Sequence, residues 1–292
     1  MQLDHTRVTI RERSILEICD LALHVVRDFM PRLLTMWLVG VLPMAILNYF
    51  LIGRLVDDLT GPSFARYAWI MSLLVFIETP LATAAMTMFL GDAMFMEPPT
   101  LRKVLKSIST LSGKLFLTQG LWRGVIPAWL LALSLSTESA GWGDAFFVLL
   151  IIYLVFMRAL RPYVMEIVLL ERNPLWARDQ RAITIGRRSS KLHNPNAGEL
   201  FARYLAIILV SVLLAVMVLF GIWFAIGMLQ NDWRWGPLML HVVYPASLWT
   251  VAGYMAVVRY LAYLDLRTRR EGWAVELQMR AEANRLAKQM AI

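Results

Sequence analysis

Five charged side chains lie inside apolar stretches of this sequence, and they have the most capacity for chemistry. They are Glu78, Arg123, Arg158, Arg161 and Glu166. In hydrocarbon each such charge costs roughly 2.5–3.5 kcal/mol at a helix centre, so it is retained where it has a function or a partner. Carboxylate and guanidinium groups together could hold a lipid headgroup, an anionic solute or a proton.

Two interpretations of this intramembrane polar cluster are open. Neighbouring spans would let Glu78 reach Arg123 or Arg158, and Glu166 follows Arg158 by about two helical turns. The cluster is then either a binding site or a network that joins helices while its arginines extend to the interface. One ion pair does not make a pathway, so the structural interpretation is favoured.

A second set of residues could meet lipid headgroups or a partner protein. It consists of Arg187, Arg188, Lys191, Arg267, Arg269, Arg270 and Trp273. Basic side chains next to apolar spans attract anionic headgroups on the cytoplasmic face. Alternatively they only anchor the topology, or pair with Asp265 and Glu271.

Other chemistries find no support in the residue pattern. Four scattered histidines and a single cysteine, Cys19, give no metal-ligand spacing, and no phosphate-binding loop or nucleophile elbow occurs. The net charge of +8 is spread along the flanks of apolar spans, without a nucleic-acid-binding signature. We therefore predict no catalytic residue, no metal, no cofactor and no nucleic-acid partner, and expect a protein that is not an enzyme.

The elements that position these residues are predicted to be membrane helices. The chain of 292 residues is 59% hydrophobic and only 17% charged, with a mean hydropathy of +0.58. Its apolar residues gather in runs of about twenty, the length that crosses a bilayer. We predict an all-α bundle of six transmembrane helices over residues 33–52, 67–90, 115–135, 145–170, 204–228 and 238–263.

Amphipathic segments flank this six-helix membrane domain, which we place at residues 33–265. Residues 1–32 include an interfacial helix that Pro31 bends or ends, and residues 100–111 have a similar pattern. Residues 266–292 are predicted to form a cytoplasmic C-terminal helix.

The distribution of positive charge predicts the orientation. With both termini in the cytoplasm, 25 of the 29 Lys and Arg residues lie on the inner side and 3 on the outer side. The opposite orientation violates the positive-inside rule at every loop. This pattern favours a multi-pass protein of the bacterial cytoplasmic membrane, with both termini in the cytoplasm.

A weak internal repeat accompanies this pattern. The sequence Gly-Val-Leu-Pro at 40–43 recurs as Gly-Val-Ile-Pro at 124–127, each time after an amphipathic segment. The repeat would divide the chain into three units of a surface helix and a hairpin of two spans. A match of four residues also arises by chance, so both interpretations stand.

Three motifs resemble a broad group of poorly characterised bacterial six-span membrane proteins. They are Ser14-Ile15-Leu16-Glu17 before a span with Leu42-Pro43, Glu171-x-x-Pro174 leading to Arg188-Ser189, and the run from Tyr260 to Trp273. That group is related to the membrane domain fused to some glycerophosphodiester phosphodiesterases. The catalytic barrel of those enzymes is absent here, so the resemblance implies a membrane module without their reaction.

Two functions follow as hypotheses. The first is a scaffold or accessory subunit that binds anionic lipid and a partner membrane protein, or a second copy of itself. The second is a transporter or lipid-handling protein that uses the intramembrane Glu/Arg cluster. A transporter should show a solvent-connected cavity at mid-membrane and broken helices. A scaffold should have a packed bundle with its exposed apolar or basic surface at the cytoplasmic side.

Overall fold

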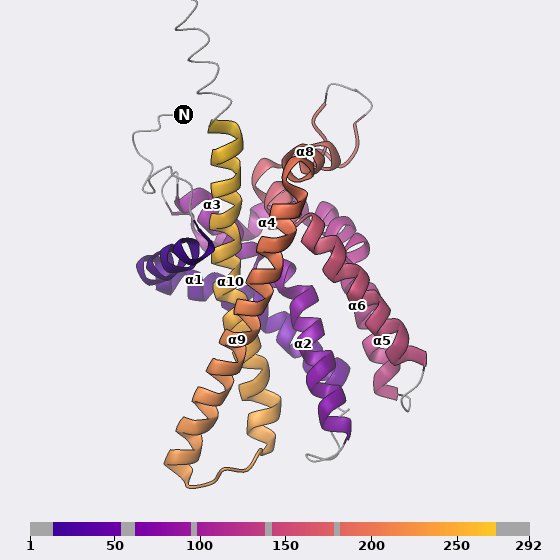
Figure 1. The fold of residues 1–292 in the computed structure, drawn as a ribbon, viewed down its shortest axis with the longest axis vertical. Helices are drawn as coiled ribbons and strands as arrows, with labels where there is room; N and C mark the ends of the chain where they lie inside the picture. The colour runs from indigo at the N-terminus through magenta and orange to yellow at the C-terminus, as the bar shows by residue number, and fades with distance from the viewer. Residues whose placement is uncertain (1–13, 54–61, 95–97, 138–141, 178–181, 273–292) are drawn as a thin grey trace, which may run out of the picture.

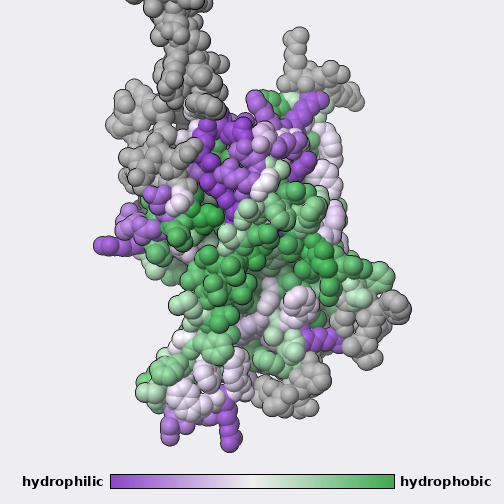
Figure 2. Space-filling model, in the orientation of Figure 1, coloured by the Kyte–Doolittle hydropathy of each residue, from purple (hydrophilic) through white to green (hydrophobic). Residues whose placement is uncertain are grey.

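The structure, a computed structural model, describes residues 14–53, 62–94, 98–137, 142–177 and 182–272. Its regular structure within these ranges is entirely helical (Figure 1). Hydrophilic residues gather at the upper end of the molecule, over α8 (Ile185–His193), above a broad hydrophobic band (Figure 2). This distribution is typical of a multi-pass membrane protein.

Four described helices are long and apolar enough to cross a membrane. They are Ile15–Ile52, Phe64–Ala93, Ile185–Gln230 and Met239–Gly272. A fifth crossing is available if Ala145–Leu160 and Val164–Glu171, which meet at 68°, form one bent span. Val125–Leu135 is apolar but shorter.

Six helices form three contacting pairs that extend toward the lower end in Figure 1. The pairs are α1 (Ile15–Ile52) with α2 (Pro62–Ala82), α5 (Val125–Thr137) with α6 (Trp142–Leu160), and α9 (Ala197–Gln230) with α10 (Tyr244–Arg267). The shorter elements α3 (Ala84–Ala93), α4 (Leu101–Leu115), α7 (Val164–Glu166) and α8 lie toward the upper end.

Helix α1 combines a surface segment and an apolar segment. Its start is a capping box, in which Ser14 and Glu17 exchange side-chain-to-backbone hydrogen bonds. The helix kinks at Phe29, where φ is −113° and ψ is 15°, because Pro31 has no N–H and its ring crowds the preceding turn. Exposed Leu16 and Leu23 precede the kink.

The predicted span at 115–135 is wrong as one continuous helix. After α4 the chain forms a π-helix, η3 (Phe116–Trp122), and then turns at Arg123 and Gly124 before α5 begins. Gly124 has φ +69°, a left-handed conformation that glycine adopts without steric cost. The charged residue Arg123 therefore lies at the turn and not inside a helix. The apolar helix that follows is shorter than predicted.

The predicted helix at 145–170 is also wrong as one straight element. Helix α6 ends at Leu160, and the chain continues through α7 and the π-helix η4 (Ile167–Glu171) at 68° to it. Pro162 lies at the break, and its missing N–H and its ring prevent the helix from continuing.

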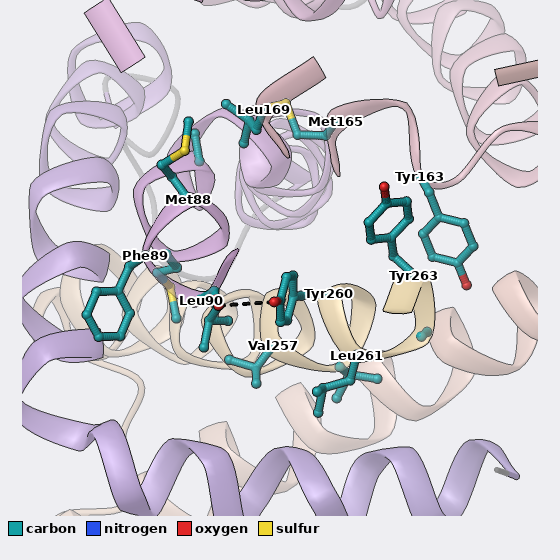
Figure 3. Packing of buried hydrophobic residues seen from close by; sticks show 14 of the residues in the cluster. Met88, Phe89, Leu90, Tyr163, Met165, Leu169, Val257, Tyr260, Leu261 and Tyr263 are labelled. Atoms are coloured by element: carbon teal, nitrogen blue, oxygen red, sulfur yellow. Dashed lines mark hydrogen bonds between the residues drawn. The ribbon is translucent and has the colours of Figure 1, made fainter. Parts of the chain in front are cut away.

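Helix α10 is the centre of the bundle. It contacts α1, α2, α3 and α9, and most of its side chains are buried. Figure 3 shows part of the upper core, where Tyr260 of α10 donates a hydrogen bond to the carbonyl oxygen of Leu90 in α3 at 3.0 Å. In the lower core Trp249 is 1% exposed.

The two glycines of the sequence repeat have different structural roles. Gly40 lies within α1, and a Cβ atom there would lie 1.8 Å from the carbonyl oxygen of Ala82. Gly124 is instead in the turn before α5, against the side chain of Leu154. The two four-residue matches thus have different backbone conformations.

Replacing Gly40 by alanine is expected to destabilise the protein by about 1–3 kcal/mol, because Ala82 presents backbone at this contact and α1 must move away from α2. Thermal unfolding in detergent measures this effect. Gly198→Ala in α9 is the matched control, since no atom lies within 4 Å of its added Cβ. Equal unfolding temperatures of the two variants would contradict the close α1–α2 contact.

Candidate functional site

A cavity of about 370 Å³ lies between α2, α9 and α10. Most of its wall is apolar, including Val75, Ile207, Ala215 and Val251. Three arginines line it as well, namely Arg123, Arg158 and Arg259. The cavity therefore combines a largely apolar wall with a cluster of positive charge.

Arg158 is 3% exposed and is held by the backbone of α2. Its guanidinium donates to the carbonyl oxygens of Phe76 at 2.6 Å and Ile77 at 2.5 Å. Pro80, four residues after Phe76, has no N–H, so it leaves the Phe76 carbonyl without its helical partner. Arg158 supplies the missing donor from a different helix.

Arg123 is 8% exposed and has a similar role at the end of α6. Its guanidinium donates to the carbonyl oxygen of Arg161, at the break that precedes Pro162. A cation at a helix C-terminus is favourable because carbonyl groups there have no helical partner and the helix dipole is negative. The side chain of Arg161 itself points to Ser190 Oγ, 3.5 Å away.

Arg259 is the cavity arginine that pairs with a carboxylate. Its Nε lies 2.5 Å from Glu166 Oε1, and its Nη2 lies 3.5 Å from Thr83 Oγ1. Glu166 is fully buried. This ion pair joins α10 to α7, which directly follows the break in the fourth predicted span.

Glu78 is not part of the arginine cluster. Among the described residues its two carboxylate oxygens accept from Asn48 Nδ2 at 2.7 Å and from Trp129 Nε1. The predicted contact with Arg123 or Arg158 is therefore wrong, because Arg158 binds the backbone one residue before Glu78. Glu166 likewise pairs with Arg259 and not with Arg158.

The polar groups at the other end of the cavity are satisfied within the protein. Tyr244 donates to the carbonyl oxygen of Ala68 at 2.7 Å and lies 2.5 Å from Ser72 Oγ. Ser247 donates to the carbonyl oxygen of Val243. The charged side chains of the cavity thus lie at the opposite end, around Arg123, Arg158 and Arg259, which we call the arginine end.

The basic residues predicted to face headgroups or a partner are mostly bonded within the chain. Arg188 binds Glu171, with its Nε 2.6 Å from Oε2, and also binds Glu271. Arg267 pairs with Glu271 at 2.6 Å. Glu271 thus pairs with Arg267 on its own helix and with Arg188 of α8, and Asp265 likewise pairs with Arg269 and with Arg203 of α9.

The remaining members of this set differ in their surroundings. Arg269 lies 3.1 Å from Asp265 and 3.2 Å from Glu199, and Arg270 donates to Asn196. Arg187 donates to the carbonyl oxygen of Ala182, and Lys191 is exposed. Trp273 lies outside the described residues.

Two residues of the cavity were not predicted from the sequence. Arg259 lies within the predicted span at 238–263 and within the apolar helix Met239–Gly272, yet it is not among the five charges singled out from the sequence. Tyr204 lines the cavity near all three arginines, close enough to interact electrostatically with Arg123 and Arg158. Counting Arg259 with the intramembrane charges would have identified it.

No protein-family model matches this chain, and neither does any curated protein or solved structure. Functional interpretation therefore depends on the geometry of the cavity. Among the described residues, no group of three or more His, Cys, Asp or Glu side chains lies close enough to hold a metal ion.

The pairing of Arg158 with the proline-freed carbonyl of Phe76 can be measured with a double-mutant cycle. Arg158→Met is expected to destabilise the wild-type protein more than it destabilises the Pro80→Ala variant. In that variant the N–H of Ala at position 80 can donate to the carbonyl oxygen of Phe76, so Arg158 is no longer needed there. The expected coupling is about 1–3 kcal/mol, in the range of hydrogen bonds to charged groups. The free energies of unfolding of the wild type, the two single variants and the double variant are measured in mixed detergent micelles.

Arg102→Met on the exposed face of α4 provides the control, and its effect should be the same in both backgrounds. Equal costs of Arg158→Met with and without Pro80 would show that Arg158 does not compensate for the proline.

Proposed function

We propose that this protein binds an anionic lipid in the cavity between α2, α9 and α10. The observation that supports this proposal is the junction of three arginines with a long apolar wall in one cavity. A lipid has the matching distribution, with a negative headgroup joined to hydrocarbon. The proposal develops the lipid-handling hypothesis. The cluster that it uses contains Arg259, whereas Glu78 lies outside it.

The dimensions of the cavity suit an acyl chain. Its lining on α10 extends from Tyr244 to Arg259, about 22 Å at the rise of an α-helix. One leaflet contributes about half of the hydrocarbon core of roughly 30 Å. An acyl chain from one leaflet could therefore extend along the wall from the arginine end.

The cavity also has a side that is accessible from outside the bundle. Val212 and Val216 of α9 line it, yet they are 54% and 46% exposed. In a membrane this side would face hydrocarbon. A lipid could then enter laterally without leaving the bilayer.

The membrane arrangement that we propose has six spans. The four long helices, the bent α6–α7 segment and the short helix α5 would supply them, with both termini in the cytoplasm. The excess of Lys and Arg at the inner side supports this orientation and a bacterial cytoplasmic membrane. We also propose that the protein acts by binding and not by catalysis.

The scaffold hypothesis is supported by a different surface. Helix α4 presents Arg102, Lys103 and Lys106 outward, and such a basic face could meet anionic headgroups or an acidic partner. This role does not exclude the lipid cavity. A protein that co-purifies in stoichiometric amount from native membrane would favour the scaffold hypothesis.

Filling the apolar part of the cavity is expected to abolish lipid retention. Ala215 lines the cavity, so Ala215→Phe would fill the space along α9. Native mass spectrometry of the purified protein in mild detergent measures the retained lipid. Wild-type protein should retain one anionic lipid, and Ala215→Phe should lose most of it.

Ala225→Phe is the matched control, since Ala225 lies on the same helix, is exposed and does not line the cavity. It should retain lipid as the wild type does. Equal lipid retention by Ala215→Phe and Ala225→Phe, or no bound lipid in the wild type, would contradict the proposal.

A further inference from the structure

The charges at the arginine end of the cavity do not balance. Among the described residues, Arg123 and Arg158 donate hydrogen bonds only to backbone carbonyls, whereas Arg259 is paired with Glu166. The other buried carboxylates of the described residues bond elsewhere, Glu78 to Asn48 and Trp129, and Asp265 to Arg203 and Arg269. Arg123 and Arg158 thus have no ion pair with a carboxylate in the described part of the chain. Glu166 also attracts Arg123 at longer range, but three arginines and one carboxylate still leave two positive charges in excess at this end.

These two cations are almost entirely removed from solvent. Arg123 and Arg158 are 8% and 3% exposed, and they are close enough to repel each other. A buried charge is costly unless it is paired, because its desolvation is not repaid. A bound anion would relieve both the desolvation and the repulsion.

Hydrogen-bond donors are also available at this end. A guanidinium has five N–H groups. The described bonds use one donor atom of Arg123 and two of Arg158, and the buried Nε of Arg158 has no hydrogen-bond partner among the described residues. The planar fork of arginine matches the spacing of phosphate oxygens.

We infer that the cavity selects a lipid with a dianionic phosphomonoester headgroup. This inference rests on the proposed lipid-binding function. A phosphomonoester above its second pKa of about 6 carries two negative charges and three terminal oxygens, and these match two unpaired arginines. A phosphodiester or a fatty-acid carboxylate carries a single negative charge and leaves one arginine without a counter-charge.

The test compares two lipids that differ by one charge. Dioctanoyl phosphatidic acid and dioctanoyl phosphatidylmethanol have the same acyl chains, but the methyl ester is a monoanion. Each is titrated into the detergent-solubilised full-length protein at pH 8, and binding is followed by native mass spectrometry. Glycerol 3-phosphate, which has the headgroup charge without the chains, is added as a competitor.

Phosphatidic acid is expected to bind about tenfold more tightly than phosphatidylmethanol, since one further buried cation is neutralised. Arg123→Gln should abolish this preference, whereas Arg102→Gln, which removes an exposed charge on α4, should keep it. Should Arg123→Gln fail to fold, the comparison of the two lipids on wild-type protein still decides the inference.

Each of the other outcomes contradicts one part of the inference or of the proposed function. Equal affinity for the two lipids would refute selection for a dianion and leave the lipid cavity in place. Competition by glycerol 3-phosphate at the concentration of the lipid would assign the site to a soluble phosphate. Binding of neither lipid would refute the proposed function itself.

Discussion

The structure depends on one constraint, namely that a backbone carbonyl in hydrocarbon must find a donor inside the protein. Pro80 and Pro162 each break a helical hydrogen-bond ladder within segments apolar enough to cross a membrane. Arginines from other parts of the chain reach the resulting carbonyls, Arg158 at Phe76 and Arg123 at Arg161. The bends in the helices and the positions of the arginines therefore have a common cause.

This constraint also joins the two interpretations of the charged cluster. The arginines stabilise broken helices, which is a structural role. Neutral carbonyl oxygens do not cancel a positive charge, however, so the same contacts leave the cavity electropositive. The capacity to bind an anion thus follows from the way in which the bundle compensates for its prolines.

Much of the fold could be predicted from hydropathy, because the need for long apolar helices is a property of composition and length. The breaks were harder to predict, although Gly124, Pro162 and the neighbouring arginines are visible in the sequence. Whether a charge within an apolar run pairs with a carboxylate or with a carbonyl depends on the packing of helices distant in sequence. Glu78 illustrates this difficulty, since its partners Asn48 and Trp129 come from α1 and α5.

The central position of α10 has a consequence for biosynthesis. Glu166 finds its cation on Arg259, 93 residues later in the chain. During translation the segment that carries Glu166 is therefore made well before its ion-pair partner, and until α10 is made the cation Arg123 attracts Glu166 at longer range. Chains that stop before α10 would keep a buried carboxylate without its ion pair, so the upper part of the bundle depends on the last long helix to be made.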